Sequence, residues 1–532
     1  MHVPLHPTST SNTPSSPVSK SAQAEGVSVT HRLIWIGAVS ILLYSGLAWL
    51  YPLWEGLHKP LRTWAGLVQA NGIIGGLHAF TYIALMALYV LGLKVMRRLS
   101  GPSQRVTLVV LAVWLMSISA MAFSYPGESQ DIFDYIFRGR MYRLYGRSPL
   151  DTTPFELQDK PFARYVSWAK WVDAYGPIWE YASGNIAALT QTTANNAETS
   201  VRVNSTCRQQ PSVCSLLLKH VLAYRLFSVL CASLCGALIY ALVKHHSPAD
   251  ALAALMAWLW NPLLLIAAGA GGHNETLVIL PVLLMLWLMQ RHQWLGGLLC
   301  LFAAVHIKLT CLIFLPPVCL WLFARLGWKA TLLRLSIFAA LAAPLSWLLY
   351  EPLGGWETLQ RNLYERSIFS ANSISNVIYW LLREWAMWER YDAQRTVARY
   401  APLTFAVVAG VWLWRWWRGR THTDATLWQA LATVATLYFL VGSYWFQYWY
   451  LLWLAALVGM FPRSAWASKF LPAYGLGGLL ATHTLDFLTQ QQTFPAPTPA
   501  LASVLYVTIL LLPLVLAATG SRLISPPHAK SP

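Results

Sequence analysis

The sequence predicts an all-α, polytopic membrane protein, and three features lead to this fold class. Hydrophobic residues make up 56% of the 532-residue chain, whereas only 11% of its residues are charged. A soluble protein carries about a quarter charged residues, so this chain lacks the charge to cover a water-facing surface. Its apolar residues form runs of about 18 or more, the length that crosses a bilayer core as a helix. Short basic clusters stand at the ends of these runs, as membrane topology requires.

Fourteen apolar runs are candidate transmembrane helices, and because several are short we expect about 12 to 14 spans. With the N-terminus in the cytoplasm, every connection on the inner side contains Lys or Arg, which satisfies the positive-inside rule. Both chain ends then lie in the cytoplasm. The runs lie near residues 33–52, 73–93, 106–124, 215–243, 251–270, 276–290, 294–305, 309–324, 332–350, 400–414, 427–442, 445–461, 468–485 and 499–518.

The chain divides into one membrane domain and two tails. Residues 1–30 are rich in Ser, Thr and Pro and have no apolar stretch, which predicts a disordered cytoplasmic tail. Residues 31–520 are expected to form a single transmembrane domain, followed by a second cytoplasmic tail at 521–532. Two long segments, 125–214 and 351–399, are expected on the extracytoplasmic side, where they carry short surface helices.

The net charge of +17 first suggests a nucleic-acid partner. The basic residues stand at span ends, however, so topology explains them and we expect no nucleic-acid binding. Acidic residues collect on the outer side, although Asp and Glu contribute little to orientation. Chemistry on the outer face is the simplest cause of this asymmetry. The outer acids are Glu128, Asp131, Asp134, Asp151, Glu156, Asp159, Asp173, Glu180, Glu275, Glu351, Glu357, Glu365 and Asp486.

Two cysteines of the first outer segment, Cys207 and Cys214, are candidates for a disulfide bond. An oxidising setting outside the cytoplasm permits such a bond. Two free thiols are the alternative. The other five cysteines lie in apolar runs, where small buried thiols are ordinary.

The start of the first outer segment holds the residues best suited to chemistry. Pro126-Gly127 breaks the third span as it leaves the membrane, and a short helix follows. Asp131, Tyr135 and Arg138 fall near one stripe of this helix at helical spacing. Asp131 is therefore expected close to the membrane surface.

A carboxylate at that depth can act as a general base beside a lipid-bound phosphate ester. It would take a proton from an acceptor hydroxyl as the oxygen attacks a sugar's anomeric carbon, which contributes about 10²–10⁴-fold. Partial desolvation raises the basicity of such a group. We assign Asp131 as the base and Asp134 as a supporting residue. The alternatives are that Asp131 only stabilises a helix N-terminus, and that Asp134 only pairs with Arg138 four residues on.

The motif residues of this segment are Asp131, Tyr135, Gly139-Arg140, Gly146-Arg147-Ser148-Pro149 and, after a spacer, Tyr175-Gly176-Pro177. This pattern resembles the first outer loop of class C (GT-C) membrane glycosyltransferases that use polyprenyl-phosphate sugars. It looks most like bacterial polyprenol-phosphate-mannose-dependent alpha-mannosyltransferases. The chain departs from the pattern at Leu150, where an aromatic residue usually follows the Pro, and this position concerns acceptor contacts.

Three later segments extend the resemblance in the same order as in those families. They are Gly272-His273-Asn274-Glu275, Lys308 with Pro316-Pro317, and Gln447-Tyr448-Trp449-Tyr450. The resemblance implies an inverting transferase of the bacterial inner membrane that moves a sugar, most plausibly mannose, from a polyprenyl-phosphate donor to a lipid-linked or glycan acceptor. Asp131 is then the catalytic base. The residues expected beside the base are Asp134, Tyr135, Arg138 and Arg140, and those expected at the substrate are Tyr175, His273, Asn274, Glu275, Gln447 and Tyr448.

Three cations are candidates for the donor phosphate. Arg225 lies about 15 Å into the fourth span at 1.5 Å per residue, where a charge costs about 2.5–3.5 kcal/mol. Lys308 falls between two short apolar runs, and its ammonium suits an anionic leaving group. Arg366 lies in the second outer segment after Tyr364. A structural partner in the bundle is the alternative for Arg225 and Lys308, and a solvated loop is the alternative for Arg366.

The spacing of His273 and Glu275 does not indicate a metal site, and no third ligand is evident. A divalent ion, Mg²⁺ or Mn²⁺, beside Asp131 and Asp134 stays open. His273 has the alternative of a hydrogen-bonded packing residue. A transporter or flippase for a sugar or a lipid-linked sugar is the second function considered. Transporters tend to carry repeats and ionisable groups at the membrane midplane, whereas most acids here lie on one face.

Overall fold

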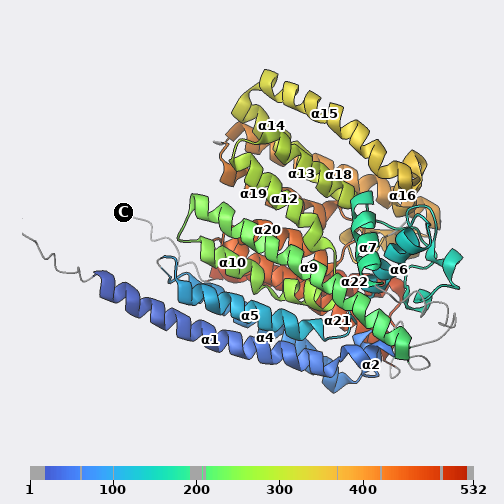
Figure 1. Cartoon of the computed structure of the whole chain (residues 1–532), viewed down its shortest axis with the longest axis horizontal. Coiled ribbons are helices and arrows are strands. Elements are labelled where there is room, and N and C mark those ends of the chain that lie inside the picture. The colour runs from blue at the N-terminus through green and yellow to red at the C-terminus, as the bar shows by residue number, and fades with distance from the viewer. Residues whose placement is uncertain are drawn as a thin grey trace, which may run out of the picture.

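The computed structural model describes residues 18–59, 63–99, 101–191, 207, 211–367, 370–419, 422–491 and 495–523. These residues are helical almost throughout, and two isolated bridges, Pro52 to Ser124 and Ala371 to Trp445, are the extended pairings found among them. The long helices lie side by side, with α6 and α7 gathered at one end of the bundle (Figure 1). The protein is therefore an all-α polytopic membrane protein.

The helices, in chain order, are α1 Val18–Leu50, α2 Leu53–Leu57, α3 Trp64–Leu67, α4 Gly72–Met96, α5 Gln104–Ala122, α6 Asp131–Leu144, η1 Pro154–Leu157, η2 Ala163–Tyr165, α7 Pro177–Thr190, α9 Pro211–His246, α10 Ala251–Leu259, α11 Pro262–Leu264, η3 Leu265–Ala270, α12 Glu275–Gln290, α13 Trp294–Ile307, η4 Leu309–Phe314, α14 Leu315–Leu326, α15 Trp328–Tyr350, η5 Glu351–Leu353, α16 Gly355–Ser367, α17 Ile374–Glu384, α18 Arg390–Gly419, α19 Asp424–Leu437, η6 Tyr438–Gly442, η7 Tyr448–Leu451, α20 Leu452–Gly459, η8 Trp466–Phe470, α21 Leu471–Gln490 and α22 Pro499–Leu523.

By length and composition, nine helices of the described chain can cross a membrane, or ten if α10 and the α11–η3 stretch count as one bent span. Three shorter apolar helices, Glu275–Gln290, Trp294–Ile307 and Tyr448–Gly459, fall below that length. Each of the fourteen predicted apolar runs overlaps one helix or two or three consecutive helices. The count of about 14 spans itself stays a prediction.

Helix α1 begins earlier than the sequence predicts. Residues 18–30, assigned by composition to a disordered tail, form its first turns. This stretch contains Ala22, Gln23, Ala24 and Glu25, which are good helix formers, so it extends the apolar helix that follows. Helix α1 thus includes residues 18–30, while residues 1–17 lie outside the described part. At the other end, α22 continues to Leu523.

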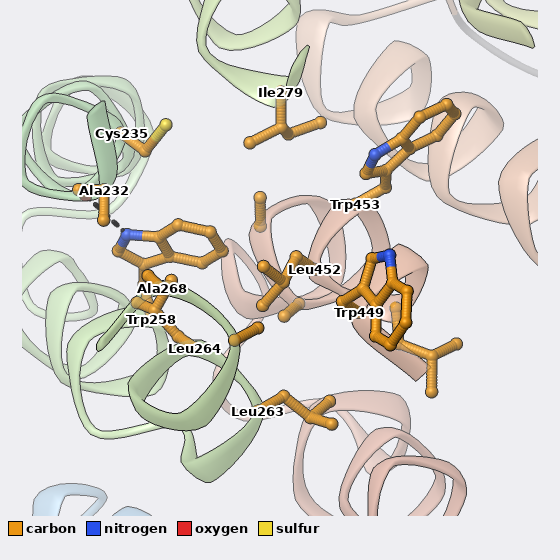
Figure 2. Packing of buried hydrophobic residues seen from close by; sticks show 14 of the residues in the cluster. Ala232, Cys235, Trp258, Leu263, Leu264, Ala268, Ile279, Trp449, Leu452 and Trp453 are labelled. Atoms are coloured by element: carbon orange, nitrogen blue, oxygen red, sulfur yellow. Dashed lines mark hydrogen bonds between the residues drawn. The ribbon is translucent and has the colours of Figure 1, made fainter. Parts of the chain in front are cut away.

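The interior of the bundle is filled by large apolar side chains from α9, α10, α12 and α20. Figure 2 shows Trp258, Ile279 and Trp453 among the buried residues of this core. The indole of Trp258 is fully buried and donates its N–H to the carbonyl of Ala232 at 2.8 Å. A buried indole needs such a partner, so this bond fixes α10 against α9.

The chain that leads into α6 is fixed by the ends of α1 and α5. The bridge from Pro52 to Ser124 joins these ends, and the amide of Tyr125 donates to the carbonyl of Tyr51 at 2.7 Å. The indole of Trp64 donates to the carbonyl of Tyr125. The segment between α5 and α6 is thus held by hydrogen bonds to the chain that follows α1 and to Trp64 at the start of α3.

A disulfide bond joins Cys207 and Cys214, the two cysteines that the sequence analysis paired. The hydroxyl of Tyr165 lies 3.3 Å from the sulfur of Cys207 and donates to the carbonyl of Leu57 at 2.6 Å. The disulfide therefore lies beside the folded part of the first outer segment.

Helix α6 packs against α7 and α9 at Gly139. A Cβ atom at this position would lie 2.6 Å from the carbonyl oxygen of Ser183 and closer still to the hydroxyl of Tyr224. Both oxygens are held, because Tyr224 donates to the carbonyl of Ser183 at 2.8 Å. The Gly-Arg motif is thus explained at its first residue by close helix packing.

Gly139→Ala is expected to lower the melting temperature of the purified protein in detergent. Alanine normally stabilises a helix by about 1 kcal/mol relative to glycine, but overpacking costs about 1–3 kcal/mol and reverses the sign here. Gly410→Ala in α18 is the matched control, since no atom lies within 4 Å of its built Cβ. An unchanged or raised melting temperature for Gly139→Ala would contradict the packing.

Candidate active site

Asp131 is the first residue of α6, and its side chain is 20% exposed, whereas the next ten residues of the helix are buried. Its amide donates to the hydroxyl of Ser129 at 3.2 Å, which fixes the helix start. Burial raises the pKa of Asp131 to about 6 and outweighs the hydrogen bonds from Ser129 and Trp168 and the charge of Lys308, which lower this pKa. The carboxyl group is therefore a stronger base than an ordinary aspartate and is still accessible.

His273 is brought to Asp131 by a turn that only glycine allows. Gly272 has a φ of 62°, and a Cβ there would lie 2.7 Å from the side chain of Ile132. His273 Nδ1 lies 3.8 Å from Asp131 Oδ2, and the ring stacks on Trp449 with centroids 4.0 Å apart. Burial, and then the charge of Lys308, lower the pKa of His273 to about 3, so the imidazole is neutral.

The polar atoms of His273 and Asn274 are buried without hydrogen-bond partners in the described structure. Both ring nitrogens of His273 and both amide atoms of Asn274 are in this state, with the residues 1% and 2% exposed. Buried polar groups are normally paired, so such orphans indicate a place for a bound polar molecule. These donors and acceptors lie next to the carboxyl group of Asp131.

Glu275 and Lys308 form a buried ion pair at the same end of the bundle. Lys308 Nζ donates to Glu275 Oε1 at 2.5 Å, and the other carboxylate oxygen accepts the indole N–H of Trp453 at 2.6 Å. Lys308 Nζ also lies 3.6 Å from the ring centroid of Tyr450, a cation–π contact. The lysine side chain is 12% exposed, so its ammonium is not sealed off.

Tyr175 joins the first outer segment to Lys308. Its hydroxyl lies 3.0 Å from the hydroxyl of Tyr135, and its ring centroid lies 5.7 Å from Lys308 Nζ. The amide of Gly176 donates to the carbonyl of Ile307 at 2.9 Å, and a Cβ on Gly176 would collide with the carbonyl of His306. The Tyr-Gly-Pro motif therefore docks on the last turn of α13, next to the lysine.

Asp134 and Arg138 fold the outer loop onto α6. The two oxygens of Asp134 accept the amides of Ser167 at 3.1 Å and Trp168 at 3.0 Å. Arg138 donates to the carbonyls of Trp168 at 3.1 Å and Trp171 at 2.9 Å. Burial raises the pKa of Asp134 to about 7, although Arg138 lies 3.9 Å away. Both residues thus support the loop that lies against Asp131.

These contacts bear on a metal ion at Asp131 and Asp134. Each oxygen of Asp134 accepts one backbone amide, so this side chain is engaged by the loop, and a divalent cation beside Asp131 and Asp134 stays a prediction. In the described part of the chain no three side chains of His, Cys, Asp or Glu gather as a metal site. No step is assigned to a metal.

Two predicted site residues are bonded away from Asp131. Arg140, fully buried, donates to the hydroxyl of Tyr145 at 3.0 Å and lies 4.9 Å from the ring centroid of Phe162. Arg225 donates to the carbonyls of Ser124 at 2.7 Å, Ala122 at 2.5 Å and Ala270. These carbonyls stand where α5 and η3 end and lack helical partners. The contacts of Arg225 favour its structural alternative over a phosphate contact.

The second outer segment reaches the site through Ala371 and Asn372. The bridge from Ala371 to Trp445 sets the segment beside the late aromatic motif, and Asn372 donates to Gln447 Oε1 at 3.4 Å. Arg366 belongs to α16, but its side chain lies outside the described structure. Its expected phosphate contact stays a prediction.

Some residues of the site were not among those predicted. Glu128 is one of them: it lies beside the buried side chain of Tyr448, a predicted site residue, and accepts a hydrogen bond from the hydroxyl of Tyr82. Burial raises the pKa of Glu128 to about 7. Trp449 stacks on His273, and Trp453 holds Glu275. The late aromatic run contained Trp449 and hinted at its role, whereas nothing in the sequence singles out Trp453 among 28 tryptophans.

The helical bundle with its polar cluster at one end is that of a class C (GT-C) glycosyltransferase fold. The chain belongs to the family described as alpha-(1->6)-mannopyranosyltransferase, N-terminal domain, whose pattern matches residues 32–325. The pattern of glycosyltransferase family 87 matches residues 213–443. Alpha-(1->6)-mannopyranosyltransferase A of Corynebacterium glutamicum is 26% identical over 198 residues, which is 37% of this chain and 35% of that relative. The match thus spans about a third of the relative's length.

Arg225→Met is expected to destabilise the protein by about 3 kcal/mol, because three buried carbonyl groups lose their donor. The measurement is the thermal melting of the purified protein in detergent. Arg105→Met, at an exposed arginine of α5, is the control and should melt as wild type does. A normal melting temperature for Arg225→Met, with weakened donor binding, would instead restore the phosphate assignment.

Proposed function

We propose that this protein is an inverting glycosyltransferase that moves a mannosyl residue from a polyprenyl-phosphate donor to a lipid-linked or glycan acceptor on the extracytoplasmic face. One observation carries the proposal: an accessible carboxyl group of raised pKa, Asp131, next to unpaired buried polar groups and a lysine. The family membership supports the reaction class, and the fold supports the membrane setting.

In the proposed reaction Asp131 removes the proton of an acceptor hydroxyl. The hydroxyl oxygen attacks the anomeric carbon from the side opposite the phosphate, a new C–O bond forms, and the bond to the phosphate oxygen breaks. The polyprenyl phosphate leaves with the electron pair. One displacement inverts the anomeric centre and needs one carboxylate as base and no carboxylate nucleophile.

Lys308 suits the departing phosphate. One of its three ammonium hydrogens goes to Glu275, and the rest are available to phosphate oxygens. Ion pairing with Glu275 offsets the cost of placing the ammonium group inside an apolar bundle when no substrate is bound. His273 and Asn274 suit sugar hydroxyls, because their buried donors and acceptors have no partner in the protein's described residues.

The disulfide supports the proposed orientation. Disulfides persist in oxidising compartments, and Cys207–Cys214 belongs to the same outer segment as Asp131. The positive-inside pattern of Lys and Arg also favours the extracytoplasmic side for this segment. The proposed setting is the bacterial inner membrane, with both termini in the cytoplasm.

A transporter or flippase is the second candidate, and one feature favours it. Helices α10 and α11–η3 meet at a 43° bend, and broken spans are common in transporters. The discriminating assay is movement of a labelled sugar or lipid-linked sugar across sealed vesicles that contain the purified protein without donor. Movement without transfer would favour the transporter.

Asp131→Asn is expected to reduce transfer from purified polyprenyl-phosphate mannose by about 10²–10⁴-fold, since the amide cannot accept the proton. The readout is labelled mannose in the acceptor lipid or glycan, measured on protein of wild-type melting temperature. Asp159→Asn, at an exposed carboxylate paired with Lys160 in the same segment, is the control and should transfer normally. Full activity of Asp131→Asn would refute the role of the base.

The acid side of the pH profile of kcat/KM is expected to have its midpoint near pH 6. The base acts only when ionised, and burial has raised the pKa of Asp131 to about 6, so the rate falls about tenfold per pH unit below that point and is constant above it. An aspartate in water would place the midpoint near about 4. A profile that stays flat down to that pH would contradict the assignment.

A further inference from the structure

We propose that Glu180 is a positioning residue of this active site: in its neutral form it donates a hydrogen bond to Asp173 and thereby fixes the loop that carries Tyr175. The role in catalysis rests on the proposed function. Glu180 lies in α7, on the third residue after the Tyr-Gly-Pro motif.

Glu180 is a carboxyl group without a donor. Its residue is 0% exposed, and no hydrogen bond from the described residues reaches either oxygen. An ionised carboxylate left in this state would be strongly destabilising, so the neutral form is favoured. Burial raises its pKa well above the ordinary range, and the neighbouring Asp173 raises it further. A neutral carboxyl group is itself a donor.

Asp173 is the acceptor in the proposed pair. One of its oxygens accepts the amides of Ala174 and Tyr175, and the other, Oδ2, lies 3.8 Å from Arg138 Nε. That second oxygen is buried and has no hydrogen bond. Oδ2 of Asp173 is therefore an acceptor that lacks a donor. The neighbouring neutral carboxyl group of Glu180 is a donor that lacks an acceptor.

Other titratable groups face Glu180 from two helices. Arg138 of α6 lowers the pKa of Glu180, and the Nη1 atom of Arg138 is buried without a hydrogen-bond partner among the described residues. Tyr224 of α9 also lies within electrostatic range of Glu180, and its hydroxyl bonds to that of Ser183. Arg138 thus faces Glu180 and Asp173 as well as Asp134, and a proton shared between Glu180 and Asp173 removes one negative charge from this cluster.

The pair reaches the site through the backbone of the loop. The amide of Asp173 donates to the carbonyl of Pro149 at 2.8 Å, and its carbonyl accepts the amide group of Asn362. Two residues on, Tyr175 meets the hydroxyl of Tyr135 and faces Lys308. A second negative charge at Glu180 would repel Asp173 and displace this loop.

The test compares Glu180→Gln with Glu180→Ala. Glutamine keeps the shape and the donor of a neutral glutamate, so transfer should stay close to wild type. Alanine removes the donor, and a displacement of Tyr175 by about 1 Å should cost up to about 100-fold in kcat. Glu156→Ala, at a half-exposed carboxylate of the same segment paired with Arg147, is the control and should remain active.

Infrared spectroscopy supplies a readout that does not need transfer activity. At about pH 9, above the pKa values of Asp131, Asp134 and Glu128, the wild-type spectrum should retain the carbonyl band of one neutral carboxyl group, and Glu180→Gln should lack it. This infrared comparison still tests the inference if the transferase assay fails or if Glu180→Ala does not fold.

The outcomes separate the two proposals. Loss of the carbonyl band in Glu180→Gln, together with its near-normal activity, supports the shared proton. A folded Glu180→Gln as inactive as Glu180→Ala overturns the inference, because a charge at Glu180 would then be required. Absence of the band from the wild-type protein also overturns it. A wild-type protein that transfers no sugar but shows the band contradicts only the proposed function.

Discussion

The carboxylate of Glu275 sets the constraint that organises this end of the bundle. It is completely buried in an apolar interior, where an isolated charge is costly, so it must be met by a cation and a further donor. Lys308 and Trp453 meet it, and they come from the break after α13 and from α20. Three stretches far apart in the sequence are thereby drawn to one point, and His273 is placed two residues from that point.

Two buried arginines stabilise the fold by donating hydrogen bonds to backbone carbonyls. Arg138 gathers two loop carbonyls over α6, and Arg225 gathers three carbonyls where helices α5 and η3 end. A guanidinium group offers five donors in a fixed plane, so a single side chain can satisfy several exposed backbone ends. The outer half of the protein is therefore built from irregular segments that charged side chains hold in place.

The sequence predicted the helical membrane fold, the start of α6 and the pairing of the two outer cysteines, because each depends on local pattern. It also placed His273 and Lys308 among the site residues, through short motifs. It could not reveal that Arg225 meets carbonyls, since those carbonyls belong to residues about a hundred positions earlier or some forty-five later. Trp453 was missed for the same reason: an apolar run looks the same whether or not an indole faces a buried carboxylate.

The docking of Gly176 on Ile307 has a consequence for engineering this protein. The backbone bond between them sits one residue before Lys308, so the outer loop and the lysine move as one body. Replacing the loop between α6 and α7 with a foreign one would therefore also disturb the position of Lys308. A chimera that keeps Lys308 in place must exchange the end of α13 along with the loop.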